Sequence, residues 1–142
     1  MGTQSKAKST TKRKGTKSIR ASASICWFDI PADDPQRAKK FYRSLFGWKI
    51  MKFPGAEDYW HIDTGGPDGT PDGGLIVRKH PEHSITNYMA VSSVDKSAAK
   101  VVKLGGTICK PKTAVPQMGY FVICRDTEDN EFALWEPNDR AK

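Results

Sequence analysis

The sequence lacks several features that would assign it to whole classes of protein. No stretch approaches the ~18 consecutive apolar residues that a membrane-spanning helix needs, so we expect no membrane partner. There are only three cysteines, an odd number, and none shows Cys-x-x-Cys spacing. We therefore expect Cys26, Cys109 and Cys124 to be buried, reduced thiols in a cytoplasmic protein, since each falls in a strand-like segment.

Acidic residues are missing from residues 1–24, which contain seven basic residues. This segment accounts for the whole net charge of +7, because the rest of the chain has 23 − 7 = 16 basic and 16 acidic residues. The segment has almost no large apolar side chains and lacks the apolar region of a secretory signal, so we expect a disordered basic tail. One alternative is a nucleic-acid-associated protein that uses this tail, which predicts DNA retention that weakens with salt and is lost on deleting residues 1–24.

The remaining sequence contains one pattern twice. The first copy is a strand over 25–30 and then an amphipathic helix, which begins after Asp34 and ends at Gly47. Three further strand-like segments follow, at 49–53, 59–64 and 74–79.

The second copy runs from a strand over 85–91, through a capping turn at Ser93, into a helix that ends at Gly105 and Gly106. Its three further strands are expected at 107–110, 120–125 and 131–136. Each copy is a βαβββ unit, and each is too small to bury a sheet face alone. We expect one domain over 25–138, made of modules 25–80 and 84–138 that share a core, with a short C-terminal tail over 139–142.

Several motifs in these units resemble a known superfamily. They are the strand ending Asp29-Ile30-Pro31, the helix with Phe41-Tyr42 and Phe46-Gly47-Trp48, and the segment 126–137, which reads DTEDNEFALWEP. Together they resemble the vicinal oxygen chelate superfamily, which includes glyoxalase I, bleomycin-resistance proteins, extradiol dioxygenases and fosfomycin-resistance enzymes. The resemblance implies an α+β fold with a curled mixed sheet, helices on the convex side and a concave cleft, and it implies a homodimer.

Metal-using members of the superfamily supply one ligand, usually His or Glu, from the first and last strand of each module. The corresponding positions here are Ile25, Thr86 or Asn87, the strand 74–78, and Ala133. None supplies a usual ligand for a catalytic divalent ion, so we expect no metal and no other cofactor.

Strand alternation indicates which side chains line the expected cleft instead. If Ile25 and Ala133 face it, the ligand-binding candidates are Trp27, Asp29, Tyr59, His61, Asp63, Glu131 and Trp135. An aromatic concavity with a few polar groups is the general form of a small-molecule site. The catalytic candidates are His61, an imidazole that can transfer protons near neutral pH, and Asp29, a carboxylate that can act as a base.

Each candidate also has a structural interpretation. Trp27 and Trp135 can equally cap the open sheet as core, Asp29 can bind backbone N–H groups of the adjacent turn, and His61 can simply be solvated. His80 and His83 have ligand-like spacing, but they lie in a Pro-containing junction between the modules that we expect to be an exposed linker. The Gly/Pro-rich run 64–74 is expected to be a mobile hairpin loop.

Two functions remain open besides the nucleic-acid alternative. The first is a metal-independent protein of the bleomycin-resistance kind that binds a small organic molecule in the aromatic cleft. The second is a metal-dependent lyase, isomerase or dioxygenase, similar to lactoylglutathione lyase, whose ligands have moved to Asp29, His61, Asp63 or Glu131.

Overall fold

The computed structural model describes residues 22–56 and 58–142, which form a single eight-stranded mixed sheet with two helices. The prediction of a disordered tail falls, up to residue 21, outside the described residues. In chain order the elements are β1 (Ile25–Ala32), α1 (Pro35–Phe46), β2 (Lys49–Lys52), β3 (Tyr59–Asp63), β4 (Asp72–Val77), β5 (Thr86–Ala90), α2 (Val94–Lys103), β6 (Thr107–Val115), β7 (Gly119–Arg125) and β8 (Glu131–Pro137).

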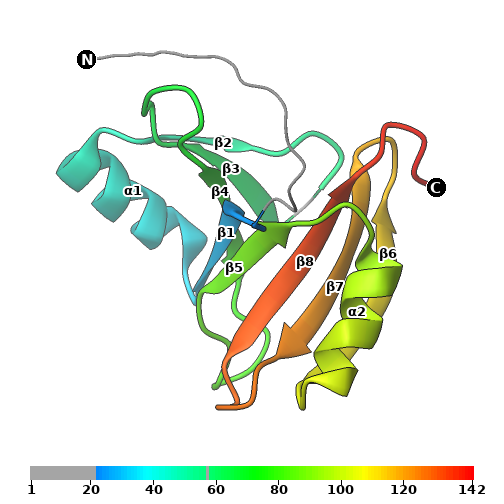
Figure 1. The fold of residues 1–142 in the computed structure, drawn as a ribbon. Coiled ribbons are helices and arrows are strands. Elements are labelled where there is room, and N and C mark those ends of the chain that lie inside the picture. The colour runs from blue at the N-terminus through cyan, green and yellow to red at the C-terminus, as the bar shows by residue number, and fades with distance from the viewer. Residues whose placement is uncertain (1–21, 57) are drawn as a thin grey trace.

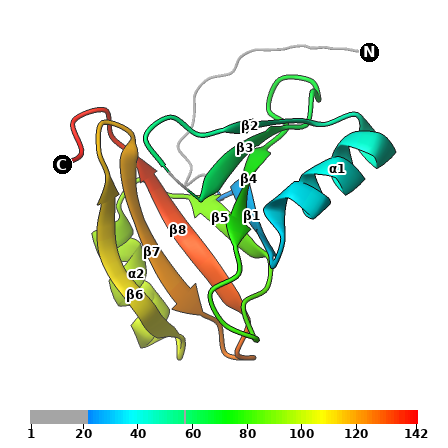
Figure 2. The same ribbon diagram turned by 180° about the vertical axis from the view of Figure 1, so that it is seen from behind.

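The sheet joins the two copies of the repeat through their first strands. The strand order is β2-β3-β4-β1-β5-β8-β7-β6, with β1 antiparallel to β5 at the centre. Within each copy the first and last strands are parallel, β1 with β4 and β5 with β8. The sheet curls without closing, and the helices lie on the outside of the curl at opposite ends (Figures 1 and 2). The predicted fold class is confirmed.

Both helices begin and end as their sequences predict. The Asp34 side chain accepts a hydrogen bond from the backbone N–H of Arg37, and Gly47 ends α1 in the left-handed conformation at φ 72°. In α2 the Ser93 side chain accepts from Lys96 N–H. The described chain contains no helix long and apolar enough to cross a membrane.

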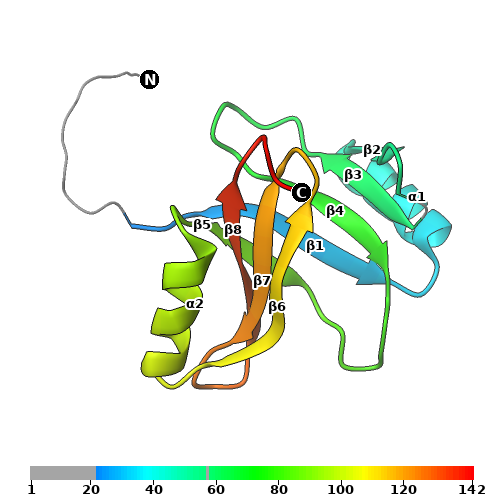
Figure 3. The ribbon, with the colours of Figure 1, turned by 90° about the vertical axis from the view of Figure 1, so that its right-hand side faces the viewer.

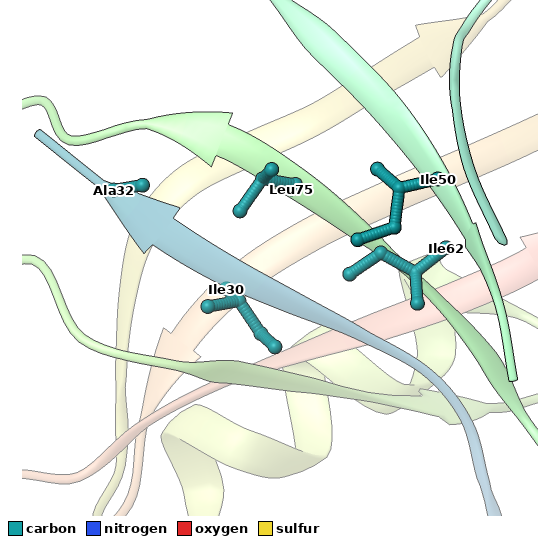
Figure 4. Close-up of a cluster of buried hydrophobic side chains, with 5 residues drawn as sticks. All are labelled: Ile30, Ala32, Ile50, Ile62 and Leu75. Atoms are coloured by element: carbon teal, nitrogen blue, oxygen red, sulfur yellow. The ribbon is translucent and has the colours of Figure 1, made fainter. Parts of the chain in front are cut away.

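Two core clusters lie between the helices and the sheet, one for each module. The first consists of Ile30, Ala32, Ile50, Ile62 and Leu75 (Figure 4). The second consists of Val94, Val122, Cys124 and Leu134. Because Ile30 and Leu134 lie on the helix side, strand alternation places Asp29 and Ala133 on the opposite, concave face.

Three local predictions differ from the structure. β4 begins at Asp72, so the end of the expected 64–74 loop is strand. β6 is an edge strand that runs on to Val115, with register shifts on both sides of Lys110 that accommodate Pro111. The thiols are free, but only Cys124 is buried; Cys26 is half-buried and Cys109 is exposed, because Cys109 lies at the bulge of this edge strand.

The junction between the modules is exposed over residues 79–82 and 84–85, as predicted, but His83 within it is buried. His83 is only 9% exposed, because its imidazole turns inward: Nδ1 accepts a hydrogen bond from the backbone N–H of Lys79 at 3.1 Å. The Arg78 side chain donates to the His83 carbonyl and to Asp33, and so ties the junction to the turn after β1. His80, in contrast, remains substantially exposed.

Candidate functional site

The centre of the concave face is a buried carboxylate surrounded by aromatic side chains. Asp29 of β1 is 6% exposed. Its Oδ1 accepts hydrogen bonds from the Tyr59 hydroxyl at 2.8 Å and from Trp27 Nε1 at 3.1 Å, and its Oδ2 accepts from the Tyr88 hydroxyl at 2.7 Å. Trp27 Nε1 also lies 2.8 Å from the Tyr59 hydroxyl. We call these four residues, Trp27, Asp29, Tyr59 and Tyr88, the Asp29 cluster.

Strand pairing explains why the four side chains meet. Trp27 and Asp29 are two residues apart on β1 and therefore share a face. Trp27 is directly opposite Tyr88 of β5, which places both rings beside the carboxylate. Tyr59 comes from β3 and reaches Asp29 across Gly74 of β4, which has no side chain to block it (Figure 3 shows β3, β4 and β1 side by side).

The cluster sets the protonation behaviour of its members. Burial raises the pKa of Asp29 above the ordinary aspartate value, while the hydrogen bonds from Tyr88, Tyr59 and Trp27 lower it in part. Burial, followed by the charge of Asp29, raises the pKa of both Tyr59 and Tyr88. Both tyrosines therefore stay protonated and keep donating, and the carboxylate already accepts three bonds. Asp29 is held as an acceptor within the protein and is poorly placed to act as a free base.

His61 has a different partner. On β3 its Nε2 lies 3.1 Å from Oδ2 of Asp72, the first residue of β4. Asp72 is itself held, because its Oδ1 accepts from the backbone N–H of Thr64 at 3.2 Å. The His61 ring lies 5.4 Å from the Trp27 ring, so this pair borders the Asp29 cluster. The His61 and Asp72 side chains are 38% and 34% exposed, which leaves them accessible to a ligand.

The other predicted site residues make no hydrogen bond to Asp29 and contact other groups. Glu131 accepts a hydrogen bond from the Thr86 hydroxyl at 2.7 Å. Asp63 accepts from the backbone N–H of Gly65 and so closes a turn at the end of β3. Trp135 lies over Gly119 of β7, where a Cβ would be 2.6 Å from its ring. The structure therefore joins Trp27, Asp29 and Tyr59 by hydrogen bonds and places His61 beside Trp27, whereas Asp63, Glu131 and Trp135 have other partners. Glu131 is still close to the cluster, because Thr86 lies directly opposite Asp29 and the charge of Glu131 helps to raise the pKa of Tyr88.

Two important residues were missed from sequence. Tyr88 shares strand and parity with Thr86, one of the two positions, Thr86 or Asn87, that the resemblance aligns with a metal ligand. Alternation from Thr86 would have identified Tyr88, whereas alternation from Asn87 would not. Its ring also meets Phe121 edge-on at 6.4 Å and so extends the aromatic surface toward β7. Asp72 could not be identified in this way, because the Gly/Pro-rich run before it obscures where β4 begins.

The donor set does not fit the divalent metal that the superfamily implies. Ile25 and Ala133 offer no ligand atoms, the Thr86 hydroxyl is bonded to Glu131, and both oxygens of Asp29 face N–H or O–H donors. The described residues contain no group of three or more His, Cys, Asp or Glu side chains that could hold a metal ion. Asp29, His61, Asp63 and Glu131 each have a separate partner, so they do not form a displaced ligand set.

Comparisons with known proteins agree with this architecture. A family model described as bleomycin resistance protein-like N-terminal matches residues 24–65. The chain is 30% identical over 124 residues to a Mycobacterium bovis protein named as a glyoxylase, CFP32, with 79% of this chain covered. Since the match covers only 45% of that protein, the chain spans less than half the length of this relative.

A second relative has nearly the same extent as this chain. It is a glyoxylase-like domain-containing protein of Didymella fabae, 30% identical over 118 residues, with 78% of this chain and 91% of the relative covered. Among solved structures, a glyoxalase/bleomycin resistance protein/dioxygenase superfamily member from Vibrio splendidus 12B01 superposes with a TM-score of 0.60 at 11% identity. That match covers 82% of this chain and 100% of the other and shows a shared fold.

Proposed function

Because the chain belongs to the vicinal oxygen chelate superfamily of glyoxalase-like and bleomycin-resistance-like proteins, we propose that it binds a small organic molecule on its aromatic concave face, without a metal ion. The Asp29 cluster is the observation that carries this proposal. Three aromatic side chains are fixed by hydrogen bonds to one buried carboxylate, so their rings are already oriented before a ligand arrives. Such preorganisation reduces the entropy lost on binding.

The chemistry of the face favours a flat, largely apolar ligand. Trp27, Tyr88 and Phe121 offer ring surface, and aromatic contacts contribute about 0.5–1.5 kcal/mol each beyond area burial. Asp29 offers little to a cationic ligand, because three donors already occupy its oxygens. The metal-dependent alternative has less support, because its four candidate ligands point to separate partners.

The four tryptophans allow a matched test on the full chain. Trp27 lies on the concave face, whereas Trp60 packs against the first core cluster on the opposite face. We expect planar aromatic compounds from a metabolite and antibiotic panel to bind, and Trp27→Phe to weaken their binding about tenfold. Trp60→Phe should leave the affinity unchanged. Equal affinities in wild type and Trp27→Phe, or no binding across the panel, would overturn the proposal.

A second measurement separates the proposal from the metal-dependent alternative. Protein purified without chelator should contain no stoichiometric transition metal, and EDTA should leave ligand affinity unchanged. Loss of binding on EDTA treatment and its recovery with Zn, Mn, Ni or Fe would favour the lyase or dioxygenase alternative. The homodimer and the cytoplasmic location stay predictions, the first testable by sedimentation velocity and the second by imaging the tagged full chain.

A further inference from the structure

The pair of His61 and Asp72 makes one nitrogen of His61 available on the concave face. Asp72 is an acceptor at its Oδ2, so the Nε2 of a neutral His61 must carry the proton. The other nitrogen, Nδ1, is then an unprotonated acceptor. No described residue makes a hydrogen bond to it, and the side chain is 38% exposed.

The surroundings of His61 hold this arrangement in place. Asp72 cannot turn away freely, because Thr64 N–H donates to its Oδ1 and so fixes the carboxylate. The neighbouring Trp27 ring is fixed by Asp29 and Tyr59. A ring bound beside Trp27 would therefore lie next to the His61 imidazole, whose Nδ1 can accept a hydrogen bond.

We propose that His61 selects the ligand through Nδ1, and that the preferred ligands are neutral, planar aromatic molecules with one O–H or N–H donor on the ring. This inference rests on the proposed binding function and names the class of ligand. Asp72 acts as a positioning residue, since it sets which nitrogen of His61 accepts. An O–H or N–H donor on the ligand that reaches this nitrogen adds about one ordinary hydrogen bond. Such a ligand should therefore bind up to about tenfold more tightly than an analogue without the donor.

The test compares two probes with the same ring system, 2-naphthol and its O-methyl ether 2-methoxynaphthalene, by equilibrium dialysis against the full chain at pH 7. Wild type should prefer the naphthol about tenfold. His61→Phe should reduce that preference to near one without weakening the ether. His61→Asn should retain part of it, because an amide oxygen can take the place of Nδ1. Asp63→Asn, on the same strand and face, is the matched control and should behave as wild type.

Asp72→Asn and a spectroscopic readout test the positioning role. In wild type, ¹⁵N NMR should show neutral His61 protonated at Nε2, and Asp72→Asn should shift the tautomer population and lower the naphthol preference. The inference is overturned if both probes bind wild type equally, if the preference survives His61→Phe, or if wild-type His61 is protonated at Nδ1. Failure of the proposed binding function gives a different result: either neither probe binds, or Trp27→Phe does not change the affinity of the probes.

Discussion

The backbone of Gly74 lies directly against the phenol of Tyr59. A Cβ at position 74 would stand 2.2 Å from the Tyr59 hydroxyl oxygen and 2.5 Å from Oδ1 of Asp29. The hydrogen bond from Tyr59 to Asp29 thus passes through space that only glycine leaves open. Position 74 requires glycine because glycine has no side chain, and not because of its conformational freedom.

Gly74→Ala should therefore destabilise the protein strongly for a conservative change. The new methyl group must displace the phenol, which adds overpacking to the loss of a donor from a buried carboxylate, and we expect a cost of about 2–4 kcal/mol. Urea unfolding measures it. In a double-mutant cycle with Tyr59→Leu the two costs should be clearly less than additive, because both changes break the same contact. Additive costs would show that the cluster does not depend on this approach.

Tyr88→Phe removes one donor from Asp29 and leaves the ring in place. The hydroxyl is 2.7 Å from Oδ2, so its loss leaves one oxygen of a buried carboxylate without this donor. We expect the free energy of unfolding, measured with urea, to fall by about 1–3 kcal/mol. Tyr42→Phe is the control, since the Tyr42 hydroxyl makes no hydrogen bond within residues 22–56 and 58–142, and it should cost under about 0.5 kcal/mol.

The same variant should move the titration of Asp29. The Tyr88 hydrogen bond lowers the pKa of this carboxyl, so removing it should raise that pKa further. Because the pKa of Asp29 is raised in the folded protein, the unfolded chain loses this proton at a lower pH than the folded chain does. The stability that Asp29 contributes therefore decreases as the pH rises from the ordinary aspartate pKa through the raised pKa. Carboxyl ¹³C NMR follows the titration directly. A pKa that stays the same or falls in Tyr88→Phe would contradict the assigned hydrogen bond.

The repeated pattern predicted most of the fold because its signals are local. Asp34 and Gly47 mark the ends of α1. The faces of β1 and β8 followed from the ligand positions that the resemblance implies, Ile25 and Ala133, extended along each strand by alternation. The Asp29 cluster was only half predicted, since alternation assigns Trp27, Asp29 and Tyr59 to a face but cannot show that they bond to one another. That convergence depends on Gly74 lying between β3 and β1, a neighbour relation set by sheet order.

His83 was misjudged for a similar reason. A polar residue close to a proline is typical of a surface loop, and the hydrogen bond from Lys79 N–H to its imidazole can be identified only once the loop is folded.

Gln117→Gly should stabilise the protein. Gln117 has a left-handed backbone with φ 65°, which costs a residue with a Cβ about 1–2 kcal/mol, and its N–H bond to the Ala141 carbonyl would remain. Glycine adds about 0.5–1 kcal/mol of backbone entropy to the unfolded state, so the net gain should be roughly 0.5 kcal/mol. Asp129→Gly, at φ 67°, should gain less, because it also loses the contact with Arg125 at 3.4 Å. Thermal unfolding compares the two variants, and a less stable Gln117→Gly would contradict the argument.

His83 should make stability depend on pH in the direction opposite to Asp29. Burial lowers the pKa of His83 below the ordinary histidine value of 6.5, although nearby Glu131 acts to raise it. The unfolded chain therefore takes up this proton first, so stability is fully present above pH 6.5 and is lost as pH falls through the lowered pKa. His83→Asn keeps an acceptor for Lys79 N–H but cannot be protonated, so its stability should fall less than that of wild type between pH 7 and pH 5. His80→Asn removes an exposed imidazole whose ring centre lies 5.4 Å from that of His83 and whose charge helps to lower the pKa of His83, so its pH profile should lie between those of wild type and His83→Asn. Urea unfolding at each pH gives the curves, and parallel curves for wild type and His83→Asn would show that His83 does not titrate on unfolding.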